Sequence, residues 1–170
     1  MRIHLRKADI IYFELKGPFP LEETEYAGYR FERQEGLSIA NYLKMYKKIG
    51  APWYWSGRLL MSDEKLKQTI SASDTYIYFL KELKNTVGYF ELKITGEEAE
   101  LVYFGLCQNH IGHGLGKLMM NKVKAVAQEK NLRRLWLHTC SFDSPKAVEF
   151  YLKSGFRLYK KTSGWEKHLF

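Results

Sequence analysis

A glycine-rich turn in the middle of the chain constrains the fold more than any other feature of the sequence. Residues 112–116 read Gly-His-Gly-Leu-Gly, after an apolar, strand-like run at 100–106 and before a helical stripe that begins at Leu115. Glycine permits positive φ and close backbone approach, and the first N–H groups of a helix have no partner within it. This order predicts a backbone site for an anion such as phosphate. A plain strand-to-helix connection is the alternative that the turn alone leaves open.

Two nucleotide-binding motifs do not fit this turn. The dinucleotide motif G-x-G-x-x-G fails because its third glycine position, counted from Gly112 or Gly114, holds Lys117 or Met119. The P-loop motif fails because Lys117 is followed by Leu118, where that motif needs serine or threonine. The turn therefore belongs to another kind of phosphate-binding arrangement, if it binds phosphate.

The hydrophobic pattern predicts an α+β fold, with about four helices packed on a mixed, mostly antiparallel sheet of about six or seven strands. Short polar joins at 81–85 and 95–98 suit antiparallel hairpins. We expect Ser62 to cap one helix and Gly155 to end another. The expected strands cover 10–16, 75–80, 86–93, 100–106, 134–139, 156–161 and 165–170. The expected helices cover 37–48, 63–70, 115–126 and 145–154.

Composition places the chain among ordinary globular domains. Its 170 residues, 45% hydrophobic and 27% charged, suit one domain with a sizeable core. The net charge of +8 favours an anionic partner, but the basic residues form no concentrated stripe of the kind expected for nucleic-acid binding. Two cysteines are too few for a disulfide scaffold, and no signal peptide or membrane-length apolar run is recognised. We therefore expect a cytoplasmic protein.

Three segments resemble those of the GNAT superfamily of acetyl-CoA-dependent N-acetyltransferases. Residues 104–119 are similar to its acetyl-CoA signature, with Ile111 where that signature has Gln or Arg. Residues 147–156, Ala-Val-Glu-Phe-Tyr-Leu-Lys-Ser-Gly-Phe, resemble its A-x-x-x-Y-x-x-x-G-F segment. Residues 99–106 look like the strand that carries the base glutamate in the histone-modifying branch. The resemblance covers roughly residues 75–162 and implies a GNAT-like fold.

The resemblance also implies a single N-acetyltransferase domain over 1–170, with an acetyl-CoA-binding core at 75–162 and a variable, substrate-side portion at 1–74. Such a domain transfers an acetyl group from acetyl-CoA to an amine and needs no metal. Strand backbone would hold the thioester arm, and the glycine turn would hold the diphosphate. The implied cofactor-binding residues are Phe104, Gly105, Leu106, Ile111, Gly112, His113, Gly114, Leu115, Gly116, Lys117 and Ser144.

Acetyl transfer to an amine requires a base, because a lysine-type amine with a pKa near about 10.4 is mostly ammonium at pH 7. Glu100 is the only acidic residue in the run 100–106, and the resemblance assigns it this role. The resemblance makes Tyr151 the general acid. A thiol pKa of about 8.5 against about 10 for tyrosine means that Tyr151 would mainly donate a hydrogen bond to the departing sulfur. A solvated Glu100 and a Tyr151 that only packs are the structural alternatives.

Other residues are assigned by position or are weaker candidates. Trp53, Trp55 and His138 are expected on the acceptor side, since the first two lie in the variable portion and the third lies on a strand beside the thioester cleft in the family. Cys140 with His138 as a nucleophile and base is a weaker hypothesis than a buried, apolar cysteine. Asp143 is expected to be a turn residue.

Two non-enzymatic functions are the alternatives to acetyl transfer. A binding module that senses CoA, or one that binds nucleic acid through its basic surface, would need neither Glu100 nor Tyr151. We expect a CoA thioester and an amine as partners, without a membrane or nucleic acid, and a homodimer is compatible with the sequence. A zinc site is disfavoured, because the phosphate turn would point several of its ligands in different directions. Its ligands would come from Cys107, His110, His113, His138 and Cys140.

Overall fold

A single seven-stranded sheet runs through the molecule in the order β2-β3-β4-β5-β6-β1-β7. The computed structural model describes residues 3–24 and 26–169. All neighbouring strands are antiparallel except β5 and β6, which are parallel, so the predicted mixed, mostly antiparallel sheet is confirmed. The strands are β1 (Ile3–Lys16), β2 (Tyr29–Arg33), β3 (Thr75–Glu82), β4 (Asn85–Thr95), β5 (Glu98–Leu106), β6 (Arg134–Cys140) and β7 (Arg157–Leu169).

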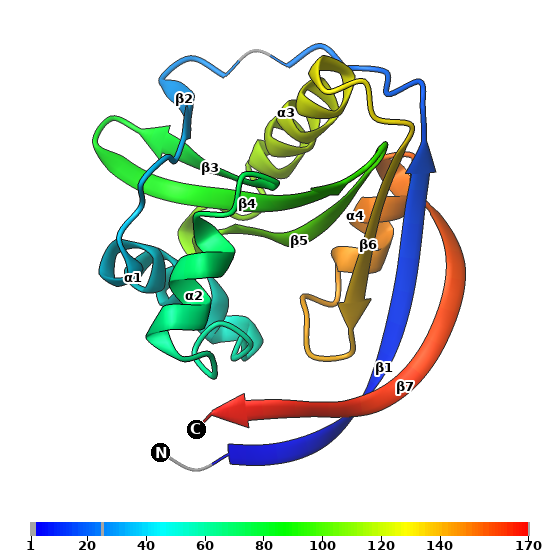
Figure 1. Ribbon diagram of the computed structural model, residues 1–170. Helices are drawn as coiled ribbons and strands as arrows, with labels where there is room; N and C mark the ends of the chain where they lie inside the picture. The colour runs from blue at the N-terminus through cyan, green and yellow to red at the C-terminus, as the bar shows by residue number, and fades with distance from the viewer. Residues whose placement is uncertain (1–2, 25, 170) are drawn as a thin grey trace.

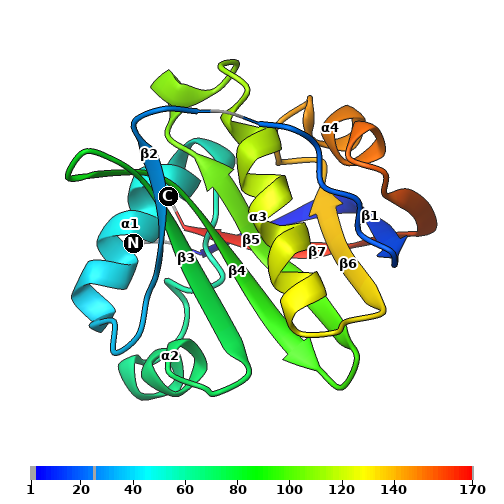
Figure 2. The ribbon, with the colours of Figure 1, turned by 90° about the horizontal axis from the view of Figure 1, so that it is seen from above.

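Four α-helices cover the two faces of the sheet (Figures 1 and 2). The helices are α1 (Ile39–Gly50), α2 (Asp63–Ile70), α3 (Leu115–Glu129) and α4 (Ala147–Lys153). Helices α1 and α2 pack with β3, β4 and β5 on one face, and α3 and α4 pack on the other. Ser38 and Ser62 cap α1 and α2 by accepting backbone N–H groups, as expected for serine at that position. In the part of the chain that the structure describes, no helix combines the length and apolar character needed to cross a membrane.

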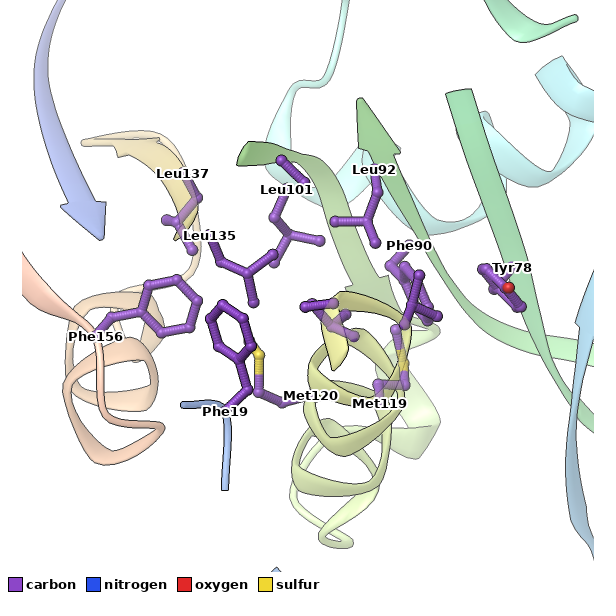
Figure 3. Packing of buried hydrophobic residues seen from close by; sticks show 14 of the residues in the cluster. Phe19, Tyr78, Phe90, Leu92, Leu101, Met119, Met120, Leu135, Leu137 and Phe156 are labelled. Carbon is purple, nitrogen blue, oxygen red and sulfur yellow. The ribbon is translucent and has the colours of Figure 1, made fainter. Parts of the chain in front are cut away.

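The larger core lies between α3 and the sheet (Figure 3). Met119 and Met120 on α3 are at most 2% exposed and meet Phe90 and Leu135 from the strands. Phe19, from the segment after β1, enters the same cluster. Burial of each such side chain stabilises the fold by about 1.5–3 kcal/mol. The start of α3, and with it the glycine turn, is therefore anchored to the sheet.

Strands β5 and β6 separate soon after they start. They pair only over Glu98–Glu100 with Arg134–Trp136, although β5 continues to Leu106 and β6 to Cys140. Figure 1 shows the two strands diverging from their common end. Beyond Glu100, the β6-facing edge of β5 therefore has no strand partner, and its backbone groups are free to bind another extended chain.

The N-terminal strand lies inside the sheet, between β6 and β7. It pairs with β6 over residues 10–16 and with β7 over residues 3–14. The expected strand at 10–16 is therefore extended to Ile3, because β7 provides a partner for its first half.

The two expected closing strands, 156–161 and 165–170, form one strand, β7, and that part of the prediction was wrong. Its Gly164 lies opposite Ala8 on β1, so pairing continues through the residues between the two expected strands. Phe170 lies outside the described residues. Helix α4 begins at Ala147 by its backbone bonds rather than at residue 145, although Ser144 Oγ accepts the N–H of Lys146.

Candidate active site

A cleft of about 730 Å³ lies between the diverging ends of β5 and β6. Its size falls within the range of small-molecule and cofactor sites. One end lies at the glycine turn and α4, and the other lies between the segment after α1 and the end of β7. Thirteen of the predicted site residues line it. They are Trp53, Trp55, Phe104, Gly105, Leu106, Ile111, Gly112, Gly114, Gly116, Lys117, His138, Ser144 and Tyr151.

The glycine turn has the backbone shape that its sequence predicts. Gly112 and Gly114 have φ values of 87° and 78°, in the left-handed region that favours glycine. Gly114 is the N-cap of α3, and no side chain caps the first N–H groups of this helix. These groups are the donors that an anion at a helix N-terminus would use.

Gly114 is required for a second reason, which comes from the segment that follows β1. The phenol of Tyr26 lies against its Cα, so that a Cβ at this position would collide with the Tyr26 hydroxyl oxygen. A Cβ at Gly112, by contrast, would meet nothing within 4 Å. Tyr26 thus packs against one side of the turn.

Lysines gather at this end of the cleft. Lys117, Lys146 and Lys153 line it, and Lys117 Nζ lies 2.5 Å from a carboxylate oxygen of Glu22. The backbone of Glu22 is itself held by Asn121 on α3, at 3.1 Å to its N–H and 2.6 Å to its C=O. Lys153 pairs in the same way with Glu149, so among the described residues Lys146 is the one of these lysines without an ion-pair partner, and its charge suits a phosphate group.

The edge of β5 that faces the cleft is open backbone. Phe104 and Leu106 pair with Phe90 and Gly88 of β4 on the opposite edge only. A Cβ at Gly105 would lie 2.6 Å from Ile49 and 3.1 Å from the Trp55 ring, so only glycine fits there without movement. An extended ligand could therefore pair with this strand in place of β6.

Tyr151 stands on α4 at the middle of the cleft. Its ring packs on Phe13, Phe104 and Phe156 at centroid distances of 5.9, 6.4 and 6.0 Å. Burial raises the pKa of its phenol far above the ordinary value, and Asp143 adds to the effect. Its hydroxyl makes no hydrogen bond to another described residue, although it lines the cleft. The group is a protonated donor with room for an acceptor.

Glu100 and His138 form a pair where β5 and β6 begin to separate, since Glu100 is opposite Trp136 in the last rung and His138 lies two residues further along β6. His138 Nδ1 lies 3.5 Å from Glu100 Oε1, close enough for an ion pair when the imidazole is protonated. His138 lines the cleft, whereas Glu100 lies behind it, in a smaller polar hollow that it shares with Arg58 and Lys93. A hydrogen bond from the imidazole to the Glu100 carboxylate raises the pKa of His138, and burial opposes this effect only in part. His138 is therefore the member of the pair that faces the cleft.

Asp143 is a turn residue, as expected, and it also lines the cleft. Its carboxylate accepts the Thr139 hydroxyl at 2.7 Å, the Cys140 N–H at 2.9 Å and the Trp55 indole N–H at 3.4 Å. Burial, with the charge of Asp143, raises the pKa of the Cys140 thiol to about 11. A thiol with that pKa is almost entirely protonated at neutral pH, which argues against the nucleophile hypothesis.

Aromatic rings form the wall of the cleft at its far end. Trp55 packs on Tyr103 and Tyr46 at centroid distances of 5.0 and 5.7 Å, and all three residues line the cleft. Behind this wall Arg58 forms a buried ion pair with Glu91. Burial alone would lower the pKa of the Arg58 guanidinium, but Glu91 together with Tyr42 and Tyr103 outweighs this effect, so the pKa is raised.

Glu166 on β7 is one of the cleft residues that the sequence did not predict as a site residue. It lines the cleft, and its negative charge adds to the raised pKa of His138 after the larger effect of Glu100. Side chains of a strand alternate between its two faces, so the sequence of 162–168 predicts which of them share a face. It does not predict that the face with Glu166 lies near β6. That depends on the pairing of β7 with β1.

Three predicted site residues lie outside the cleft lining: Glu100, His113 and Leu115. Leu115 is 1% exposed and packs in the core, and His113 is exposed to solvent. Only their backbone could contribute to a phosphate site. Among the described residues, no group of three or more His, Cys, Asp or Glu side chains gathers in a way that could hold a metal ion.

The strand divergence and the glycine turn define an α+β domain with a cleft between two parallel strands that separate. The sequence profile of the acetyltransferase (GNAT) family matches residues 42–156. The chain therefore belongs to the acetyltransferase (GNAT) family, which confirms the resemblance seen in its motifs.

Solved structures share the fold. A functionally unknown conserved protein from Staphylococcus epidermidis has a TM-score of 0.72 at 15% identity, over 97% of this chain and 64% of its own. A GCN5-related N-acetyltransferase from Sphaerobacter thermophilus has a TM-score of 0.71 at 14% identity, over 94% of this chain and 51% of its own. A GNAT family acetyltransferase from Elizabethkingia anophelis with acetyl-CoA bound has a TM-score of 0.61 at 17% identity, over 79% and 80%. The chain thus spans between half and two thirds of the length of the first two proteins.

Proposed function

We propose that this protein transfers the acetyl group of acetyl-CoA to an amine by direct attack on the thioester. The observation that supports this most strongly is the open edge of β5 above an uncapped glycine turn. Such an arrangement offers backbone partners to an extended amide-containing arm at one end and N–H donors to a diphosphate at the other. The GNAT family profile, which spans both features, agrees with this proposal.

The cofactor end would be held mainly by backbone. The N–H groups at Gly112–Lys117 would bind the diphosphate, with Lys146 and Lys153 nearby. Free N–H groups at Phe104–Leu106 would stabilise the negative charge that develops on the thioester oxygen. Ile111 at the usual Gln or Arg position agrees with a turn that acts through its backbone, since its side chain offers no donor.

The acceptor amine must lose a proton before or during its attack. In our proposal His138 accepts this proton in the cleft, and Glu100 stabilises the imidazolium from behind. This arrangement keeps the predicted role of Glu100 in proton removal but makes it indirect. The raised pKa of His138 brings its basicity closer to that of the amine and so favours proton transfer.

The departing sulfur needs a partner as the C–S bond breaks. The Tyr151 hydroxyl projects from α4 into the cleft and keeps its proton, because burial raises its pKa. We therefore propose that Tyr151 donates a hydrogen bond to the leaving thiolate, which then takes its proton from solvent or from His138.

The test is release of CoA thiol from acetyl-CoA in the presence of a panel of amines, with the acetylated product identified by mass. We expect amine-dependent release by the folded protein and calorimetric binding of acetyl-CoA without any amine. Failure to bind acetyl-CoA at millimolar concentration would exclude the cofactor site, and binding without transfer to any amine would favour a CoA-sensing module.

A cytoplasmic location stays part of the proposal. Cys107 and Cys140 are both free thiols, as expected for a reducing compartment. Acetyl-CoA as a cosubstrate would be available there.

A further inference from the structure

Glu166 is a carboxylate in the cleft that the proposed acetyl transfer does not use. It lies near the end of β7, where outward residues alternate with inward ones, and it is half-buried between the exposed Trp165 and Lys167. It lines the cleft together with His138. Within the described parts of the chain, its carboxylate forms no ion pair and accepts no hydrogen bond from another side chain. Its oxygens are therefore available to a ligand.

Two basic residues lie beside Glu166 in the sheet, and neither forms an ion pair with it. Arg6 lies directly opposite Glu166 in the pairing of β1 with β7, but its guanidinium lies against the rings of Tyr54 and Phe142, 5.8 and 5.9 Å from their centroids. Lys167 follows Glu166 on the strand; it lines the cleft as well and is exposed to solvent. Among the described residues, no lysine or arginine forms an ion pair with Glu166.

Three carboxylates from three elements surround His138, and only one of them is free. Glu100, Glu166 and Asp143 each raise the pKa of His138, with Glu100 first. Glu100 is paired with the imidazole, and Asp143 already accepts three hydrogen bonds from its own turn and from Trp55. Glu166 also places a negative charge near His138, and it has no partner of its own among the described residues. It also raises the pKa of Tyr103 on the opposite wall, after the larger effect of burial.

The carboxylate of Glu166 suits an acceptor that carries a second positive charge. The reacting amine must become neutral to attack, so it needs the base pair formed by Glu100 and His138. A second, unpaired carboxylate in the same cleft stabilises a charge that persists through the reaction. The aromatic ring of Trp53, which lines the same end, suits an alkyl stem and an organic cation.

We propose that Glu166 binds a second ammonium group of the acceptor, so that the protein acetylates alkyl diamines and polyamines in preference to monoamines. This inference rests on the proposed acetyl transfer and adds the class of acceptor to it. Glu166 then acts as a specificity-determining residue and takes no part in proton transfer.

The experiment compares 1,5-diaminopentane with pentylamine, two acceptors of equal length that differ in one ammonium group. We expect a higher kcat/KM for the diamine. Glu166→Gln should lower kcat/KM for the diamine about tenfold, mainly through KM, which corresponds to about 1.4 kcal/mol and lies between the effects of rim and buried charge pairs. The same variant should change the value for pentylamine by no more than about twofold.

Glu64→Gln is the matched control, because it removes one exposed carboxylate from the first turn of α2, away from the cleft. This variant should leave kcat/KM unchanged for both amines. Equal rates for the two amines in the wild type, or equal losses for both in Glu166→Gln, would overturn the role of Glu166 while leaving acetyl transfer intact. No CoA release with any amine would instead overturn the proposed function.

A binding measurement keeps the inference testable without turnover. Calorimetric titration of 1,5-diaminopentane into the CoA-loaded protein should give tighter binding than pentylamine, and Glu166→Gln should remove the difference. A difference that survives this substitution would refute the assignment. Thermal melts of both variants report whether either one fails to fold.

Discussion

Alanine at Gly114 should be far more damaging than alanine at Gly112, although both glycines belong to one turn. Both have positive φ, 78° and 87°, so alanine at either position takes on left-handed strain of about 1–2 kcal/mol. The new methyl at 112 would meet nothing within 4 Å, whereas at 114 it would collide with the Tyr26 hydroxyl. Overpacking of this kind adds about 1–3 kcal/mol. We therefore expect losses of about 1–2 kcal/mol for Gly112→Ala and about 2–5 kcal/mol for Gly114→Ala.

Tyr26→Phe separates the two contributions. It removes the oxygen that the methyl would strike and leaves the ring carbon beneath it at 3.1 Å, a contact that a small shift relieves. Alone, Tyr26→Phe should change stability by less than about 0.5 kcal/mol, since its hydroxyl has no hydrogen-bond partner among the described residues. In the Gly114→Ala background it should restore most of the excess loss, so the two changes should not be additive.

Urea unfolding of the wild type and the four variants measures these free energies, and calorimetry with acetyl-CoA measures the consequence for the turn. Loss of one N–H contact to a charged group costs about 1.5–3 kcal/mol, so Gly114→Ala should weaken acetyl-CoA binding about tenfold or more. Equal destabilisation by the two alanines, or no rescue by Tyr26→Phe, would refute the packing of Tyr26 on the turn.

Three further substitutions test the cleft and its support. The neutral form of His138 is the proposed base, so kcat/KM should rise as the pH passes through the raised pKa of His138. Because Glu100 raises this pKa, Glu100→Gln should move the rising limb of the profile to lower pH and lower kcat about 10²–10⁴-fold. A limb that does not move would contradict the pairing of Glu100 with His138. Tyr151→Phe should reduce kcat but preserve acetyl-CoA affinity in calorimetry, and lost affinity would indicate a structural role. Arg58→Met should destabilise the fold by about 3–5 kcal/mol in urea unfolding, since it leaves Glu91 buried without its partner, and a loss below about 1 kcal/mol would argue against that ion pair.

Local sequence determined the features that depend on neighbouring residues. The serine cap of α2, the left-handed Gly155 after α4 and the glycine turn before α3 all occur where predicted. Each follows from backbone conformations that few other residues adopt, or from a side chain that bonds to the next turn of chain. The acetyltransferase motifs were recognisable for the same reason.

Tertiary structure decided which distant residues meet. The placement of β1 between β6 and β7 joins positions more than 100 residues apart, and hydrophobic alternation does not specify a strand's partner. That pairing carries Glu166 to the cleft and makes β7 one continuous strand. The divergence of β5 from β6 likewise turns Glu100 toward His138 and leaves His138 to face the cleft. Sequence alone thus indicated a catalytic base and a glycine turn for acetyl-CoA. Long-range strand pairing decided which carboxylates lie near His138 in the cleft.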